Sequence, residues 1–177
     1  MMRTGWQAPW VRAVTTLMTI AVMIMIFCFS TETAEASDRR SGVISGLIIR
    51  IFHPEYGEMD SGGQQVIYDS VQHIVRKCAH FTEFTVLGFL IRLCLESWFG
   101  HRIGSGAVSG LISSGIGTCY ACTDEMHQLG TEGRSAQLTD VMVDSFGVFT
   151  GVALGTVLVR RLKRGSGAAE KLKSSRE

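Results

Sequence analysis

The feature that most constrains this chain is the gathering of its apolar residues into four segments, each close to the length of a membrane-spanning helix. The segments cover residues 11–29, 78–99, 103–123 and 138–159. A helix needs about 20 predominantly apolar residues to cross the hydrocarbon core of a bilayer. The sequence therefore predicts an all-α integral membrane protein with four transmembrane helices, whose surrounding partner is the lipid bilayer.

Lysine and arginine residues predict how these helices are oriented, because they are more frequent in cytoplasmic loops. The basic residues after the last segment, between residues 160 and 176, dominate the distribution. We therefore expect both termini in the cytoplasm, with a membrane domain at residues 1–162, an outer segment at residues 30–77 and a mobile basic tail at residues 163–177. Because Ala34-Glu35-Ala36 resembles a cleavage site, removal of the first segment as a signal peptide is the alternative.

The outer segment contains a short amphipathic pattern. Apolar residues recur at helical spacing at Val43, Ile44, Leu47, Ile48 and Ile51. This pattern predicts a helix that lies on the membrane surface outside the cell and ends at His53-Pro54, since a residue before proline avoids helical geometry. A second helical pattern begins near residue 64 and leads without interruption into the second membrane segment.

Composition excludes several classes of function. The 177 residues carry a formal net charge of +1, so nothing indicates a nucleic-acid partner. The chain has no phosphate-binding loop, dinucleotide fingerprint or Gly-x-Ser-x-Gly motif. Cys119 and Cys122 lie in an apolar segment, where cysteine commonly behaves as a small apolar residue, so we expect neither redox chemistry nor a disulfide framework.

Small residues at four-residue steps mark the third and fourth segments. They include Gly106, Gly110, Gly147, Gly151 and Gly155. Such spacing allows helices to approach closely. With 3.6 residues per turn, Asp140 and Asp144 continue the glycine stripe of the fourth helix, and Asp124 continues that of the third. We therefore expect these carboxylates to face the bundle interior, where a proton, a cationic side chain or a metal must offset their repulsion.

Three polar motifs lie at the ends of the apolar segments. The first contains Lys77, His80 and Glu83, the second Asp124, Glu125, His127 and Gln128, and the third Arg134, Asp140 and Asp144. Each has a structural explanation by itself: an interfacial lysine, a polar helix end, or a helix start capped by Ser135 or Thr139 with Asp140 in its first turn. Those explanations do not cover Asp144, one turn deeper. Ionisable groups near hydrocarbon are costly and commonly mark function.

Together the three motifs resemble the VanZ-like family of small membrane proteins, over about residues 26–155. The matching patterns are Lys-x-x-His-Phe-x-Glu-Phe, Asp-Glu-x-His-Gln and Gly-Arg-x-x-x-x-x-Asp-x-x-x-Asp. The family often has tyrosine where Phe84 stands, so that hydroxyl is missing here. The resemblance implies a multi-pass protein of the cell membrane and envelope with a shared polar site. The family takes its name from a protein associated with resistance to the glycopeptide antibiotic teicoplanin.

The chemistry of the site stays open at the level of sequence. In an enzyme, the candidate catalytic residues are His80, Asp124, Glu125 and His127. The candidate residues for binding a substrate are Lys77, Glu83, Gln128, Arg134, Asp140 and Asp144, with a lipid-linked wall precursor or a lipoglycopeptide as the partner.

Three other interpretations remain beside the enzyme. The same residues would serve a binding protein without turnover, or form an internal salt-bridge network that specifies the bundle. The nitrogen and oxygen donors also suit a divalent metal such as zinc or manganese. No compact ligand spacing such as His-Glu-x-x-His supports the metal.

Overall fold

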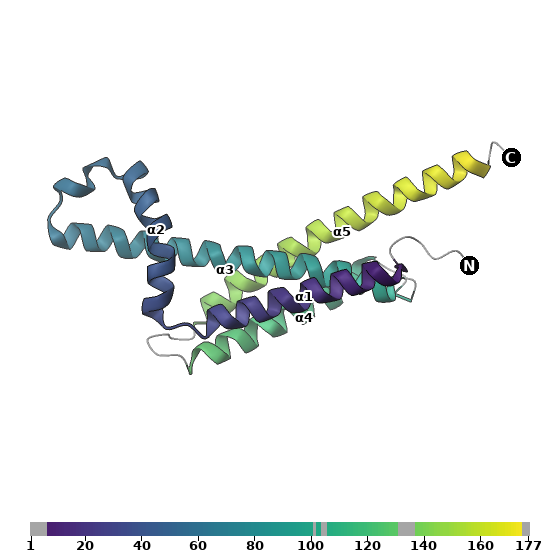
Figure 1. The fold of residues 1–177 in the computed structure, drawn as a ribbon, viewed down its shortest axis with the longest axis horizontal. Coiled ribbons are helices and arrows are strands. Elements are labelled where there is room, and N and C mark those ends of the chain that lie inside the picture. Colours follow the sequence, from purple (N-terminus) through teal and green to yellow (C-terminus); the bar gives the residue numbers. More distant parts are fainter. Residues whose placement is uncertain (1–6, 101, 104–105, 131–136, 175–177) are drawn as a thin grey trace.

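The fold is a helical bundle with a projecting helical hairpin (Figure 1). The computed structural model describes residues 7–100, 102–103, 106–130 and 137–174. Its elements are α1 (Pro9–Ser30), α2 (Ala34–Phe52), the short 3-10 helix η2 (Pro54–Glu58), α3 (Ser61–Phe99), α4 (Gly106–Gln128) and α5 (Leu138–Ser174). Helices α1, α3, α4 and α5 form the bundle, and α2 crosses α3 steeply. Helix α1 begins and α5 ends toward the same end of the molecule (Figure 1).

Three of the described helices are long and apolar enough to cross a membrane. They are α1, α3 and the part of α5 between Leu138 and Gly165. Helix α4 contains the third predicted span but is not among them, because much of its length consists of glycine, serine and threonine, which are less hydrophobic than leucine or isoleucine. The all-helical membrane character is confirmed, whereas a fourth crossing by α4 stays a prediction.

The predicted amphipathic helix is α2, and it ends at Phe52, directly before His53-Pro54. The Thr33 side chain caps its start by accepting a hydrogen bond from the backbone N–H of Ala36 at 3.3 Å. One face packs through buried Ile49 against α3. The opposite face leaves large apolar side chains exposed, with Val43 at 80%. A helix with this division of residues suits the boundary between lipid and water.

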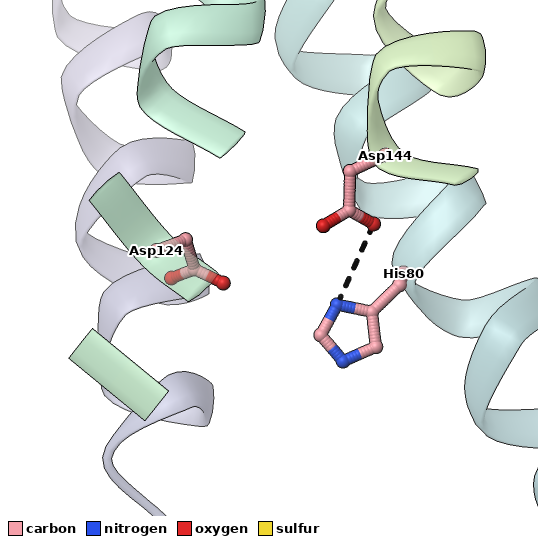
Figure 2. Close-up of side chains that lie close together, drawn as sticks. All are labelled: His80, Asp124 and Asp144. Atoms are coloured by element: carbon pink, nitrogen blue, oxygen red, sulfur yellow. Dashed lines mark ion pairs between the residues drawn. The ribbon is translucent and has the colours of Figure 1, made fainter. Parts of the chain in front are cut away.

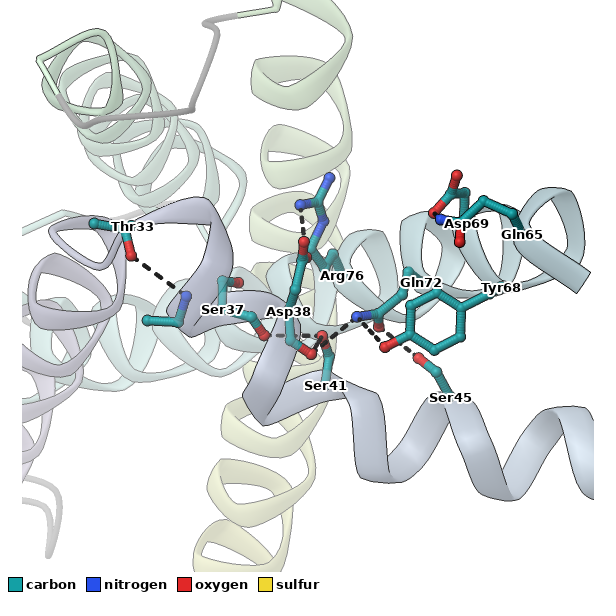
Figure 3. A network of polar contacts seen from close by, with 11 residues as sticks. Thr33, Ser37, Asp38, Ser41, Ser45, Gln65, Tyr68, Asp69, Gln72 and Arg76 are labelled. Atoms are coloured by element: carbon teal, nitrogen blue, oxygen red, sulfur yellow. Dashed lines mark hydrogen bonds and ion pairs between the residues drawn. The ribbon is translucent and has the colours of Figure 1, made fainter. Parts of the chain in front are cut away.

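A buried polar network joins α2 to the projecting half of α3 (Figure 3). The Ser45 hydroxyl donates to the Gln72 side-chain oxygen at 2.6 Å, and the Gln72 amide nitrogen donates to the Asp38 carbonyl at 2.9 Å. Arg76 Nη1 lies 3.2 Å from Asp38 Oδ1. Since Ser45 and Gln72 are buried, their polar atoms need these partners, and the network fixes the register of the two helices.

Helix α3 is one unbroken element from the hairpin into the bundle, as the sequence predicts. Asp60 caps it by accepting from the backbone N–H of Gly63 at 3.2 Å. Its 39 residues span about 58 Å, at 1.5 Å per residue. A bilayer core is about 30 Å thick, so a large part of α3 must project beyond it.

Helices α3 and α5 touch through their backbones at glycine. A methyl group at Gly147 would lie 2.5 Å from the carbonyl oxygen of Phe81, and one at Gly151 would overlap the carbonyl oxygen of Thr85. On the other helix, a methyl group at Gly88 would lie 2.9 Å from the Cα of Val148. The predicted glycine stripe of α5 is therefore a packing face, and α3 is its partner.

The apolar core lies beside this contact. It contains Ile26 of α1, Phe84 and Leu87 of α3, Ala121 of α4 and Val148 of α5. Helix α5 continues past the core to Ser174, so most of the predicted tail at residues 163–177 prolongs this helix. The mobility of the tail stays a prediction.

Candidate functional site

The site begins where the glycine contact between α3 and α5 ends. One and two turns before Gly147, α5 carries Asp144 and Asp140. Asp140 forms an ion pair with Lys77 of α3, and Asp144 Oδ1 lies 3.8 Å from His80 Nδ1 (Figure 2). The carboxylates thus continue the packing face of α5, as the helical spacing predicts. The close backbone contact holds them against the cationic side of α3.

Helix α4 adds a second buried carboxylate, which faces this pair from across the bundle (Figure 2). Asp124 is 3% exposed, and Asp144 is 1% exposed. Potential ligand atoms of His80, Asp124 and Asp144 all lie within 4.8 Å of one another. Gln128 orients Asp124, because its Nε2 donates to Asp124 Oδ2 at 3.1 Å. Three residues from separate sequence motifs, on three helices, therefore converge on one point.

Glu125, the neighbour of Asp124, anchors the start of α5. Its Oε1 accepts a hydrogen bond from the backbone N–H of Gln137 at 2.6 Å. The sequence offered Ser135 or Thr139 as the cap of this helix. Ser135 lies outside the described residues. The Thr139 hydroxyl contacts the side chains of Gln137 and Asp140 instead. The sequence analysis missed Glu125 as a cap because its partner is 12 residues away, across a loop.

The remaining predicted residues divide into three cases. His127, a candidate catalytic residue of the second motif, does not lie on the buried face of α4 with Asp124 and Gln128. Its ring is exposed and stacks on Phe27 of α1 with 4.6 Å between centroids, because helical phase turns it away from the buried side of α4. Glu83 is half-buried on α3. Arg134 lies outside the described residues.

Negative charge predominates in the described part of the site. Asp144 interacts electrostatically with the carboxylates of Asp124, Glu125 and Glu83 and with the ammonium of Lys77. Lys77 also interacts with Glu125 and forms its ion pair with Asp140. Five carboxylates are thus set against Lys77 and His80, with Arg76 nearby but paired with Asp38. Because Lys77 is already engaged, the arrangement favours a cation, an amine or a hydroxyl group over an anion bound by Lys77.

A separate charged group lies further along α3, and the sequence analysis did not identify it as a cluster. Arg92 Nη1 lies 3.1 Å from Glu96 Oε2, and Lys163 Nζ of α5 lies 2.5 Å from Glu96 Oε1. Arg92 also donates from Nε to the Thr156 hydroxyl at 3.1 Å. The available signal was an arginine and a glutamate four residues apart inside an apolar segment, a spacing that places both on one helix face.

Comparison with known proteins supplies one match. The family model described as VanZ/LLP1 matches residues 15–159, which include every residue of the polar site. No curated protein and no solved structure matches the chain.

Proposed function

The chain belongs to the VanZ/LLP1 family, and we propose that it is a multi-pass membrane protein whose polar site binds an amphiphilic component of the cell envelope. In this proposal α4 also crosses the membrane, which makes four spans with α1, α3 and α5. Both termini are cytoplasmic, and the site opens at the outer face. The starting end of α1 and the final end of α5 lie toward the same end of the molecule, which supports an even number of crossings (Figure 1). The basic residues near the end of α5 support a cytoplasmic location for that end.

The observation that carries the proposal is the burial of Asp124 and Asp144 at one point between membrane helices. Burying two carboxylates together is costly, and a protein that only needed packing would place apolar residues there. His80 and Asp140 are partly exposed, and in this proposal a ligand reaches the buried pair past them.

The chemistry of the site selects the class of ligand. Carboxylates accept hydrogen bonds from hydroxyl and amine groups, which sugars and peptides supply. The exposed apolar face of α2, next to the bundle, suits the lipid part of the same molecule. A lipid-linked wall precursor or a lipoglycopeptide combines both features, and we propose this class as the ligand.

A structural role for the same residues is the second candidate, and two contacts favour it. The Lys77–Asp140 ion pair joins α3 to α5, and the bond from Gln137 to Glu125 joins α5 to α4. Such a network specifies geometry while adding little net stability. Under this alternative, a substitution in the network changes stability and function together.

Binding to the purified full-length protein in detergent tests the proposal. Native mass spectrometry with a lipoglycopeptide, and separately with a lipid-linked wall precursor, would report binding and any product. We expect Asp124→Asn, which keeps the side-chain shape, to weaken binding at least about tenfold, since a hydrogen bond to a charged group contributes about 1.5–3 kcal/mol. Asp69→Asn is the matched control, because Asp69 is exposed on α3.

The outcomes separate the candidates. Weaker binding by Asp124→Asn at unchanged thermal stability supports a ligand site. Equal binding by both variants contradicts it. A loss of thermal stability that accounts for the loss of binding favours the structural alternative, and a mass change in the ligand shows turnover.

A further inference from the structure

We propose that His80, Asp124 and Asp144 form a binding site for one divalent transition-metal ion. One imidazole nitrogen and two carboxylate oxygens suit zinc or manganese better than magnesium, which prefers oxygen ligands and water. The proposal goes beyond the function proposed above, because the metal binds without an envelope ligand.

The first support is geometric. The three residues come from α3, α4 and α5, and their potential ligand atoms lie within 4.8 Å of one another. Zinc holds nitrogen and oxygen ligands at about 2.0–2.2 Å, so two ligands of one ion lie at most about 4.4 Å apart. The donors therefore lie a few tenths of an ångström beyond the spacing of two ligands on one ion.

The second support is the state of Asp144. Its side chain is 2% exposed, and among the described residues its Oδ1 accepts no hydrogen bond. The nearest cationic partner, His80 Nδ1, lies 3.8 Å away, which is too far for a hydrogen bond. A buried carboxylate oxygen without a hydrogen bond is expensive. Figure 2 shows this oxygen pointing toward His80 and the other Asp144 oxygen pointing toward Asp124, so an ion between the three side chains would contact all of them.

The third support is charge. Asp144 lies near the carboxylates of Asp124, Glu125 and Glu83. With a neutral His80, Lys77 is the one cationic side chain that acts on Asp144 among the described residues. A neutral imidazole, two carboxylates and a divalent cation together carry no net charge. Even with Arg134 added, the carboxylates would outnumber the cationic side chains. A metal ion therefore removes the repulsion that the arrangement otherwise contains.

The surroundings match a metal site that performs a function. Gln128 donates to Asp124 Oδ2, and such outer contacts commonly orient metal-binding carboxylates. Three protein ligands leave a position open, which is typical of metal sites that bind a substrate. If the protein binds an envelope lipid as proposed above, this open position would take a hydroxyl or phosphate oxygen of the headgroup. Only this assignment rests on the proposed function; the metal site itself does not.

Metal analysis of the full-length protein in detergent tests the site. The protein is treated with EDTA, dialysed against buffer with zinc or manganese, and analysed by mass spectrometry for metal content. We expect about one ion per chain and a gain in thermal stability, since a ligand that binds only the folded state stabilises it. Cobalt supplies a further signature, because its visible absorption reports the number and type of ligands.

Variants identify the ligands. We expect Asp144→Asn and His80→Ala each to weaken metal binding at least tenfold and to remove the stability gain. His127→Ala and Asp69→Asn, which change an exposed histidine and an exposed aspartate, should bind as the wild type does. If His80→Ala does not fold, Asp124→Asn replaces it as the second ligand variant.

Two results would overturn the proposal. One is wild-type protein that retains no metal, in which case protons offset the carboxylates. The other is equal retention by wild type and Asp144→Asn. Binding of the envelope ligand in the presence of EDTA is measured separately, so a failed metal site and a failed ligand site give different results.

Discussion

The backbone contact between α3 and α5 predicts that Gly151→Ala destabilises the bundle. Alanine adds one methyl group, which is harmless in most helical positions. At Gly151 that methyl would overlap the carbonyl oxygen of Thr85 and lie 2.7 Å from the backbone nitrogen of Phe89. Both obstacles are backbone atoms of a helix, so no side-chain rotation relieves them and α5 must move away from α3.

The size of the effect follows from two opposing terms. Overpacking in a tight core costs about 1–3 kcal/mol, and occasionally more. Replacing glycine by alanine in a helix returns up to about 1 kcal/mol. We expect a net loss of about 1–2 kcal/mol at Gly151. The displacement would also weaken the Lys77–Asp140 ion pair, which lies along the same pair of helices.

Gly115→Ala is the matched control, because no described atom lies within 4 Å of a methyl group at that position of α4. We expect it to stabilise the protein by about 0.5–1 kcal/mol through helix propensity alone. Titration with SDS in mixed micelles, followed by tryptophan fluorescence, measures both variants against the wild type. If Gly151→Ala proved as stable as Gly115→Ala, the close backbone contact would be refuted.

Two further predictions concern the other buried polar groups. Gln72→Ala leaves the Ser45 hydroxyl and the Asp38 carbonyl without their partner, and it should lower the free energy of unfolding by about 1–3 kcal/mol. Hydrogen exchange across α2 should become faster in this variant and should not change in Gln65→Ala, which alters an exposed residue. Arg92→Met removes one of the two cationic partners of buried Glu96 and leaves Lys163, so it should cost about 1–3 kcal/mol in thermal or SDS unfolding. A second change, Glu96→Met, should recover most of that loss, and no recovery would contradict the reasoning.

The helices were largely predictable from the sequence because their signals are local. Apolar spacing identified α2 and the continuous α3, and His53-Pro54 located the end of α2. The glycine stripe of α5 predicted a packing face, but a stripe does not name its partner. The stripe meets the backbone of α3 at Phe81 and Thr85, and neither residue carries a sequence signal for such a contact.

For the candidate site, the inward direction of two carboxylates was predictable, and the contacts between the helices were not. Helical phase correctly turned Asp124 and Asp144 inward, since each continues a stripe of small residues. His127 belongs to the same motif, but helical phase turns its ring to the exposed side of α4, where it stacks on Phe27. The bond from Gln137 to Glu125 joins residues across a loop, and no periodic pattern encodes such a contact.

The continuity of α3 has a mechanical consequence. Between Gly63 and Gly88 the helix contains neither proline nor glycine, so it has none of the usual sites for a kink and moves as a stiff rod. One end of this rod carries α2, held by Gln72, and the other end is pinned against Val148 at Gly88. A force on the hairpin, such as the pressure of lipid on α2, would be carried along the rod to the contacts of Phe81 and Thr85 with α5, directly beside His80. The spacing of the polar site is thereby coupled to whatever touches the protein outside the bundle.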